Sequence, residues 1–380
     1  MGQSPPSNAY NADARGVPFY QGNADFGTRH PKTRIWCDAP TKIAHAGDIL
    51  LSVRAPIGAL NIATETCCIG RGLAGLTANP EKIDTLYLYY VLQSKTHILS
   101  ALGTGSTFKA VSKAIVSEFP MPIYPLEKQK HIASVLDTIE RSIDNIHQQS
   151  NSLDELVKSQ FVELFGDLAF NPHTWKTIPL VDACTDRDDI KCGPFGTQLG
   201  KHEYIKEGIP LWGIPQINAS FSTPPTDFIT EKKSEQLEAY SILPGDIAMS
   251  RKGNVGKCAI YPQNFSRGII HSDVLRIRLN HKICNPYFMM HQLHFSRAVE
   301  SQIDAVSSGA VMAGINVTKL KNTFVHIPPL TLQNEFAAFV EQVDKSEFIT
   351  QILAIFLKKY HNNTIEALGE SADTWKGARI

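Results

Sequence analysis

Short motifs recur in the same order in the two halves of the chain. Each combines Gly, Pro, Asp or Asn with apolar or polar neighbours, and the matching pairs are 16–19 with 208–211, 46–49 with 244–247, 57–58 with 255–256, 79–80 with 285–286, and 125–129 with 329–333. One such match means little, but an ordered series indicates an internal duplication. A duplicated chain must fold as two related units.

Each copy has two parts that differ in composition. The first part is rich in Gly, Pro and Asn and holds short apolar runs such as 48–53 and 259–261. Such runs, bounded by turn residues, predict strands. The second part starts just after a proline and contains no Gly or Pro over 126–165 in one copy and 330–368 in the other. This composition predicts one long helix at the end of each copy.

Both helical stretches carry an apolar face. In the first, apolar residues alternate at spacings of four and three, as in a coiled coil, with polar Ser150 and Gln160 at two positions; the second is less regular, with a shift near Ser346. The predicted seam consists of Ile132, Leu136, Ile139, Ile143, Ile146, Leu153, Val157 and Leu164 in the first helix, and Phe336, Val340, Val343, Ile349, Leu353, Phe356 and Tyr360 in the second. We expect the helices to pair antiparallel; the alternative, that each covers its own lobe, stays open.

These features predict an α+β fold with a pseudo-twofold internal repeat. Two mixed α/β domains are expected to be joined by two long helices that form an antiparallel coiled coil. The predicted boundaries are 1–125 for the first domain, 126–166 for the first helix, 167–329 for the second domain, and 330–380 for the second helix with its tail.

The charge and the cysteine content limit the classes of protein to which the chain can belong. The 380 residues include 37 Lys and Arg against 37 Asp and Glu, but basic residues are in excess in the two domains and acidic residues in the helices, which fits domains that face a polyanion. The seven Cys residues show no Cys-x-x-Cys pair, which argues against disulfides or structural zinc. No apolar run reaches the ~18 residues of a membrane span, and the first residues do not form a signal peptide. We expect a cytoplasmic protein without membrane partners.

The known catalytic motifs are missing. Gly253–Cys258 is too short for a phosphate-binding loop, no Asn-Pro site continues as an Asn-Pro-Pro-aromatic loop, and Glu231-Lys232-Lys233 follows Asp227 too closely for a nuclease metal site. His291 and His294 lack a third ligand at a suitable spacing, so helix-surface histidines are the favoured interpretation over a metal site. We therefore expect no catalytic residues, no metal and no cofactor in this chain.

The motifs taken together resemble the specificity subunit of type I restriction–modification systems. The resemblance lies in 121–132 with its continuation to 166, in Gly193–Leu199 followed by Tyr204, Gly208–Pro210 and Gly245-Asp246, and in 2–7 with 18–22. It implies two target-recognition domains that each read one half of a split double-stranded DNA site. It also implies a helix pair that acts as a ruler and docks two methyltransferase subunits, joined by two restriction/motor subunits.

The resemblance places the chemistry outside this chain. N6-adenine methylation would use S-adenosylmethionine in the methyltransferase partner, and ATP and Mg²⁺ would act in the nuclease/motor partner. A two-lobed coiled-coil interaction scaffold without DNA readout is the alternative, and a remnant of a fused enzyme is a third interpretation. The first copy has far fewer residues before Gly16 than the second has before Gly208. The missing part matches 175–191, where an opening strand is expected, so the first domain is predicted to be shortened.

Candidate DNA contacts were chosen by side-chain chemistry. Arg and Lys pair with guanine and phosphate, whereas Asn and Gln pair with adenine. In the first domain the candidates are Gln21, Asn23, Arg29, Lys32, Arg54, Lys109 and Lys113, and in the second Lys191, Thr197, Gln198, Lys201, His202, Gln216, Asn218, Arg251, Lys252, Asn254 and Lys257. For any one of them, a solvated loop side chain is the competing interpretation. Ser112 and Asn316 match between the copies and are predicted to be helix N-caps instead.

Overall fold

The computed structural model describes residues 1–104, 109–253, 255–307 and 315–373. The chain forms two compact units, each built from two segments of the sequence. Unit 1 comprises 1–148 and 350–380, and unit 2 comprises 149–349. The two long helices therefore each contribute one part to each unit.

Unit 1 contains two small sheets with strand orders β1-β3-β2-β7-β4 and β6-β5-β8. The strands are β1 (Tyr10–Asn11), β2 (Val17–Tyr20), β3 (Trp36–Cys37), β4 (Ile43–Ala44), β5 (Ile49–Ser52), β6 (Leu60–Ile62), β7 (Cys67–Ile69) and β8 (Leu73–Leu76). The helices are α1 (Thr85–Ser94), α2 (Thr96–Ala101) and α3 (Lys113–Ser117), with 3-10 turns η1 (Ser7–Ala9) and η2 (Asn23–Asp25).

Unit 2 repeats this plan with additional strands. Its sheets have the orders β12-β11-β16-β13, β10-β17-β14-β15 and β18-β9. The strands are β9 (Lys176–Pro179), β10 (Ile190–Cys192), β11 (Ile209–Trp212), β12 (Asp227–Ile229), β13 (Ser241–Ile242), β14 (Ile247–Ser250), β15 (Cys258–Ile260), β16 (Gly268–Ile270), β17 (Val274–Ile277) and β18 (Phe324–Ile327). The helices are α5 (Ile214–Asn218), α6 (Glu231–Gln236), α7 (Pro286–Phe295), α8 (Arg297–Ser307) and α9 (Val317–Lys321), with 3-10 turns η3 (Leu180–Ala183), η4 (Arg187–Asp189), η5 (Lys201–Glu203) and η6 (Glu238–Tyr240).

Strand pairing confirms the duplication. β2 pairs in parallel with β7, and β11 pairs in parallel with β16, while the antiparallel pair β5 and β8 matches β14 and β17. The Gly2 amide donates to the Leu73 carbonyl at 2.8 Å, as the Gly193 amide donates to Val274 at 3.1 Å. Within the described part of unit 1 no strand corresponds to β9 or β10. In unit 2 the predicted opening strand is β9, which pairs with β18.

A buried glutamine anchors the start of each long helix to the N-terminus of an earlier helix of the same copy, α1 or α7. Gln129 Oε1 accepts from the amide of Asp84, the N-cap of α1, at 2.9 Å, and Gln129 Nε2 donates to the Tyr124 carbonyl at 2.7 Å. In the second copy, Gln333 Oε1 accepts from the amide of Asn285, the N-cap of α7, at 2.8 Å. Both glutamines are fully buried, so each must find hydrogen-bond partners. This requirement explains why the motif at 125–129 recurs at 329–333.

The predicted N-caps are confirmed. Ser112 Oγ accepts from the amide of Ile115 at 3.3 Å at the start of α3, and Asn316 Oδ1 accepts from the amide of Lys319 at 2.8 Å at the start of α9. Each side chain satisfies an amide that the first helical turn leaves without a partner.

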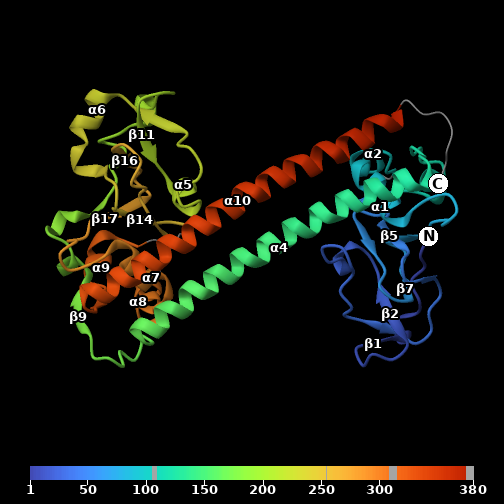
Figure 1. Cartoon of the computed structure of the whole chain (residues 1–380), viewed down its shortest axis with the longest axis horizontal. Helices are drawn as coiled ribbons and strands as arrows, with labels where there is room; N and C mark the ends of the chain where they lie inside the picture. Colours follow the sequence, from blue (N-terminus) through green and yellow to red (C-terminus); the bar gives the residue numbers. More distant parts are fainter. Residues whose placement is uncertain (105–108, 254, 308–314, 374–380) are drawn as a thin grey trace. The chain divides into compact units, whose positions relative to one another are not determined.

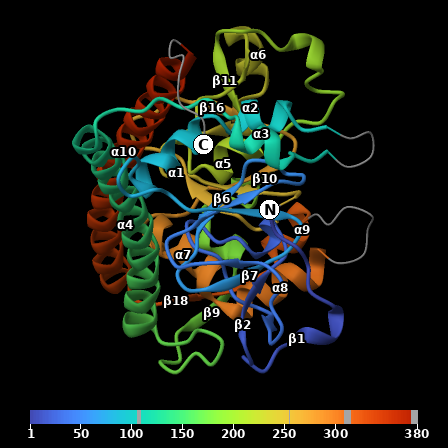
Figure 2. The ribbon, with the colours of Figure 1, turned by 90° about the vertical axis from the view of Figure 1, so that its right-hand side faces the viewer.

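The two long helices are α4 (Leu126–Phe165) and α10 (Leu330–Asp373), both shown in Figure 1. In unit 1, α1 lies against α4 (Figure 2), and Tyr90 Oη of α1 donates to Glu140 at 3.0 Å. No helix in the described ranges is long and apolar enough to cross a membrane.

Within each unit the two long helices run antiparallel. In unit 1, His147 Nε2 lies 3.1 Å from Lys358 Nζ, and Glu140 Oε1 lies 3.6 Å from His361 Nε2. Leu136 shares a core with Leu368. The residue numbers therefore rise along α10 as they fall along α4. In unit 2, Ser150 bonds Glu347, while the Phe161 and Phe336 rings lie 5.4 Å apart. The expected antiparallel pairing is therefore present. Val157, Phe161 and Phe336 also pack into the core of unit 2, so the helices cover a domain core as well as each other.

The structure corrects the second half of the predicted seam. On α4, Leu136, Ile139, Ile143, Ile146 and Val157 are buried, with Ile132, Leu153 and Leu164 partly buried; on α10, Phe336, Val340 and Val343 are buried. Ile349, Leu353, Phe356 and Tyr360, however, are exposed. The inward side of α10 continues through Glu347, Thr350, Ala354, Leu357, His361 and Leu368. These positions keep the alternating spacing of four and three, but Glu347, Thr350, Ala354 and His361 carry polar or small side chains, which the apolar pattern does not reveal.

Candidate nucleic-acid interface

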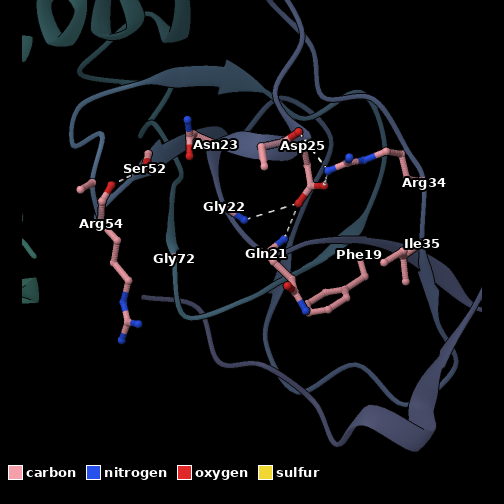
Figure 3. A pocket seen from close by; sticks show the side chains of 12 residues that line it. Phe19, Gln21, Gly22, Asn23, Asp25, Arg34, Ile35, Ser52, Arg54 and Gly72 are labelled. Carbon is pink, nitrogen blue, oxygen red and sulfur yellow. Dashed lines mark hydrogen bonds and ion pairs between the residues drawn. The ribbon is translucent and has the colours of Figure 1, made fainter. Parts of the chain in front are cut away.

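Each unit contains a hollow with a mixed polar and apolar lining at the same place in its fold. In unit 1 the hollow lies where β2 ends, beside η2, the segment before β3 and the end of β5, and has a volume of about 290 Å³. Figure 3 shows the residues that line it, including Gln21, Asn23 and Arg54. These three were predicted DNA contacts, and the structure brings them to one site.

A buried carboxylate holds one wall of the unit 1 hollow. Asp25 accepts from the Gln21 amide at 2.7 Å and from Arg34 Nη2 at 2.5 Å. Arg34 Nη2 also donates to the Ala24 carbonyl at 3.0 Å. The carboxylate therefore fixes the turn that carries Gln21 and Asn23, and it neutralises Arg34 (Figure 3).

Arg54 lies just beyond the end of β5. The Ser52 hydroxyl donates to the Arg54 carbonyl at 3.0 Å and fixes its backbone, whereas the guanidinium is exposed and has no hydrogen bond or ion pair with any described residue. A neighbouring hollow of about 390 Å³, also lined by Arg54 and Gln21, adds Arg71 and Tyr10. Gly72 lines both hollows, and a Cβ there would lie 2.4 Å from the Gln21 carbonyl oxygen. Glycine is therefore required where the two segments approach closely.

The unit 2 hollow has a volume of about 300 Å³ and lies at the equivalent place, but its side chains differ. Gln216 takes the place of Asp25: its Oε1 accepts from the Gly213 amide at 3.2 Å, and its Nε2 donates to the Pro224 carbonyl at 3.2 Å. Asp227 and Asp273 line this hollow together with His271. Lys252 Nζ lies 2.8 Å from Asp273, so this cation is paired inside the unit.

Other predicted contacts in unit 1 lie apart from the lining of the hollow. Lys32, Lys109 and Lys113 are exposed. Arg29 instead bonds Asp137 of α4, lies 3.6 Å from Glu140, and stands over the Tyr89 ring at 5.6 Å. Its guanidinium is committed to holding the domain on α4, a contact that a loop position in the sequence does not reveal.

In unit 2 several predicted contacts are engaged with the protein itself. Arg251 Nε donates to the Ile315 carbonyl at 3.0 Å, Lys191 bonds Asp188 at 3.2 Å, and Gln198 bonds the Tyr240 hydroxyl at 2.8 Å.

The remaining predicted contacts of unit 2 differ in exposure. Thr197, Lys201, His202 and Asn218 are exposed, Lys257 is half-buried, and Gln216 is buried with its amide bonded as described above. Asn254 lies outside the described residues.

The sequence-based prediction missed six Asp, Arg and His residues of the hollows: Asp25, Arg34, Arg71, Asp227, His271 and Asp273. Extending the repeat alignment would have found the equivalent positions. The Val53 amide bonds the Gly72 carbonyl as the Arg251 amide bonds Asp273, both at 2.9 Å. Gly72 is therefore equivalent to Asp273, and the residues that follow the two donors, Arg54 and Lys252, are equivalent as well.

His291 and His294 of α7 have structural partners, and His291 is buried rather than on the helix surface as predicted. His294 Nε2 accepts from the Cys258 amide at 2.9 Å, and His291 Nδ1 lies 2.7 Å from the Tyr287 carbonyl. Burial lowers the pKa of each imidazole to about 4. Burial likewise raises the pKa of the Cys67 thiol to about 12. Within the described ranges, no group of three or more His, Cys, Asp or Glu side chains is placed to hold a metal ion.

A second surface on α10 is suited to protein rather than DNA. We call it the α10 apolar stripe: Ile352, Leu353, Ile355, Phe356 and Tyr360, all in unit 1 and each 48–67% exposed. Ile352 and Phe356 lie two positions from the inward-facing Ala354, about half a helical turn away. The stripe therefore faces away from α4, and large exposed apolar patches of this kind mark interaction sites.

Two related α/β domains with equivalent but chemically different hollows, connected by paired helices, define a two-site recognition protein. A family described as the type I restriction modification DNA specificity domain matches residues 2–155 and 172–355. The chain belongs to this family of specificity subunits.

Individual relatives agree with this assignment. A putative type I restriction enzyme MjaX specificity subunit from Methanocaldococcus jannaschii is 42% identical over 158 residues, which cover 42% of this chain and 37% of that protein. The MjaIX specificity subunit from the same organism is 22% identical over 90% of this chain and 81% of its own length. The fold resembles the crystal structure of a type I restriction–modification S subunit from M. genitalium, with a TM-score of 0.65 at 16% identity over 97% of this chain and 92% of that one.

Proposed function

We propose that the chain is the DNA-specificity subunit of a type I restriction–modification complex and reads a bipartite double-stranded target. The observation that carries this proposal is the pair of equivalent hollows with different linings. The unit 1 hollow offers Arg54, Gln21 and Asn23, whereas the unit 2 hollow offers Asp227 and Asp273. Because base edges are recognised by matching donors and acceptors, one fold with two such linings reads two different half-sites.

The α10 apolar stripe supports the docking of partner subunits. Phe356 and Tyr360 belong to the aromatic types that dominate protein interfaces, and each is more than half exposed. We assign this surface to one methyltransferase subunit, and we expect a second one to bind at the equivalent position of the other copy because the duplicated chain has pseudo-twofold symmetry. Two restriction/motor subunits complete the complex.

We assign catalysis to the partners. The methyltransferase transfers the methyl group of S-adenosylmethionine to N6 of an adenine after the base has been flipped out of the duplex, and ATP and Mg²⁺ act in the restriction/motor subunits. The chain supplies the sequence specificity that directs these cytoplasmic partner subunits to their DNA target.

Mapping methylated adenines across a genome tests the proposal. Cells that contain the methyltransferase subunit are compared with and without the gene for this chain. We expect methylation at one bipartite motif only when the chain is present. An unchanged methylation pattern contradicts DNA readout, and, if the chain still assembles with partner proteins, it favours the interaction scaffold instead.

A further inference from the structure

We infer that the unit 1 hollow receives the major-groove edge of a guanine and that Arg54 is the residue that reads it. This inference rests on the proposed function, because it names the base that unit 1 selects. Guanine presents two adjacent acceptors, O6 and N7, to the major groove, and the guanidinium group matches them with two parallel donors.

Comparison of the two copies isolates Arg54 as the available cation. At the equivalent position in unit 2, Lys252 is paired with Asp273 at 2.8 Å. Unit 1 has Gly72 at the position equivalent to Asp273, so Arg54 has no carboxylate there. No described residue bonds its guanidinium. Burial of a base edge against it therefore breaks no existing ion pair.

The other charges of the hollow are neutralised. Arg34 is bound by Asp25 at 2.5 Å, and Asp25 is also held by the Gln21 amide at 2.7 Å. This pair shapes the wall and leaves no net charge. Figure 3 shows Arg34 and Arg54 on opposite sides of the Gln21-Gly22 turn; a dashed line joins Arg34 to Asp25, whereas none reaches the Arg54 guanidinium. Arg54 is thus the one lining cation of this hollow, among the described residues, without a carboxylate partner.

The walls favour a base over a phosphate. Phe19 and the exposed Ile35 line the hollow next to the polar groups, and apolar walls suit a flat ring better than a hydrated phosphate. Gln21 and Asn23 line the same hollow as Arg54 and carry amides of the type that pair with adenine. Together they provide one guanine-reading group next to amides for a neighbouring base pair.

Selection from a random duplex library tests the assignment. The full chain, co-purified with its methyltransferase subunits, is compared with Arg54→Ala and Arg54→Lys. We expect the wild-type complex to select a bipartite motif with a fixed guanine in one half. Arg54→Ala should lower the preference for that guanine by roughly tenfold to a hundredfold and leave the other half unchanged. Arg54→Lys should restore overall affinity but not the full preference, because an ammonium group lacks the bidentate geometry.

The outcomes separate the inference from the proposed function. If the wild-type complex selects no sequence, the proposed function fails, and the inference fails with it. If the wild type selects a motif but Arg54→Ala either keeps every base preference or weakens all sequences equally, Arg54 does not read a base and only the inference is overturned. Arg15→Ala, which removes an exposed arginine paired with Asp13 at 3.7 Å outside the hollow lining, is the matched control for the loss of one positive charge and should keep the guanine preference.

Discussion

Ser150 of α4 donates a hydrogen bond to Glu347 of α10 at 2.8 Å within unit 2. Both positions belong to the inward faces of the two helices, so this part of the helix pair is joined by a polar contact rather than by interlocking apolar side chains. A polar residue in a helix seam specifies register at some cost in stability. Further along α10, the inward positions are Thr350 and Ala354, which continue this weakly apolar segment.

The carboxylates near this contact predict a pH dependence. Desolvation beside the neighbouring helix and the carboxylates of Glu347, Glu341 and Asp154 raise the pKa of Asp344 to about 6. A raised carboxylate pKa means that the folded state holds the proton more tightly, so stability falls as pH rises from about 4 through 6. Because the Asp344 side chain is exposed, we expect Asp344→Asn to raise the free energy of unfolding at pH 7.5 by no more than about 1 kcal/mol. Denaturant unfolding at pH 4 and pH 7.5 measures this.

The difference between Asp344→Asn and wild type should disappear near pH 4, where the native carboxyl group is already protonated. Asp38→Asn changes an exposed carboxylate outside the helix pair and controls for a general charge effect. An equal gain in stability at both pH values would show that the carboxylate cluster is not its cause.

The α10 apolar stripe predicts a loss of binding without a loss of stability. Phe356 is 65% exposed, so Phe356→Ser should change the free energy of unfolding by less than about 0.5 kcal/mol. Truncation of an exposed aromatic anchor in a partner interface costs about 2 kcal/mol or more, so affinity for the methyltransferase subunit should fall at least about tenfold. Thermal unfolding and titration with the methyltransferase subunit check the two effects separately.

Two control variants test whether the loss of partner binding is specific to the stripe. Glu335→Ala alters an exposed charged residue near the start of the same helix, far from the stripe, and should leave partner affinity within about twofold. Leu136→Ala empties a fully buried seam position and should cost about 2–5 kcal/mol of stability. Unchanged partner affinity in Phe356→Ser would move the docking surface elsewhere.

The sequence predicted what repeats or follows a regular spacing. The heptad of α4 placed Leu136 and Ile143 in the seam, and the duplicated motifs anticipated the shared strand pairing, because both depend on local order along the chain. The register of α10 after Val343 was predicted wrongly. Exposed Ile349 and Phe356 are as apolar as core residues, and only the tertiary contacts of Glu347 distinguish the inward face.

Charged loop residues show the same limit. Arg29 and Arg54 both lie in loops, but Arg29 pairs with an acid 108 positions away, whereas Arg54 lines a hollow together with Gly72. Which arginine is available depends on partners that are brought near it only by folding. The hollow could be anticipated in position from the repeat, while its charge balance depended on Asp25 and Arg34, which form an ion pair across a turn.

We expect substitution of Arg29 to lower stability rather than to weaken DNA binding. Its side chain is 19% exposed and its partner Asp137 is 12% exposed, so Arg29→Ala leaves this largely buried carboxylate with only the exposed Arg141, whose Nη2 lies 2.9 Å from it. We expect a loss of about 2 kcal/mol in the free energy of unfolding of unit 1, the typical worth of a hydrogen bond to a charged group. The double variant Arg29→Met with Asp137→Leu should recover much of that loss, since an apolar pair replaces the ion pair. Full stability combined with weaker DNA binding in Arg29→Ala would return Arg29 to the DNA interface.

The repeated glutamines give a matched pair of tests, one in each unit. Gln333→Leu leaves the Asn285 amide and the Pro328 carbonyl without the bonds that they now make to the side chain, at 2.8 Å each. Buried polar groups without partners cost about 1–3 kcal/mol each, so we expect unit 2 to lose roughly 3 kcal/mol, and Gln129→Leu to have the same effect on unit 1. Gln342→Leu, at an exposed position of α10, should change stability by less than about 0.5 kcal/mol.

Because each glutamine fixes the start of a long helix against the N-cap of a domain helix, hydrogen exchange should show faster opening of α7 in Gln333→Leu and of α1 in Gln129→Leu. Exchange that stays as slow as in the wild type would mean that the recurring motif has no part in anchoring the helices.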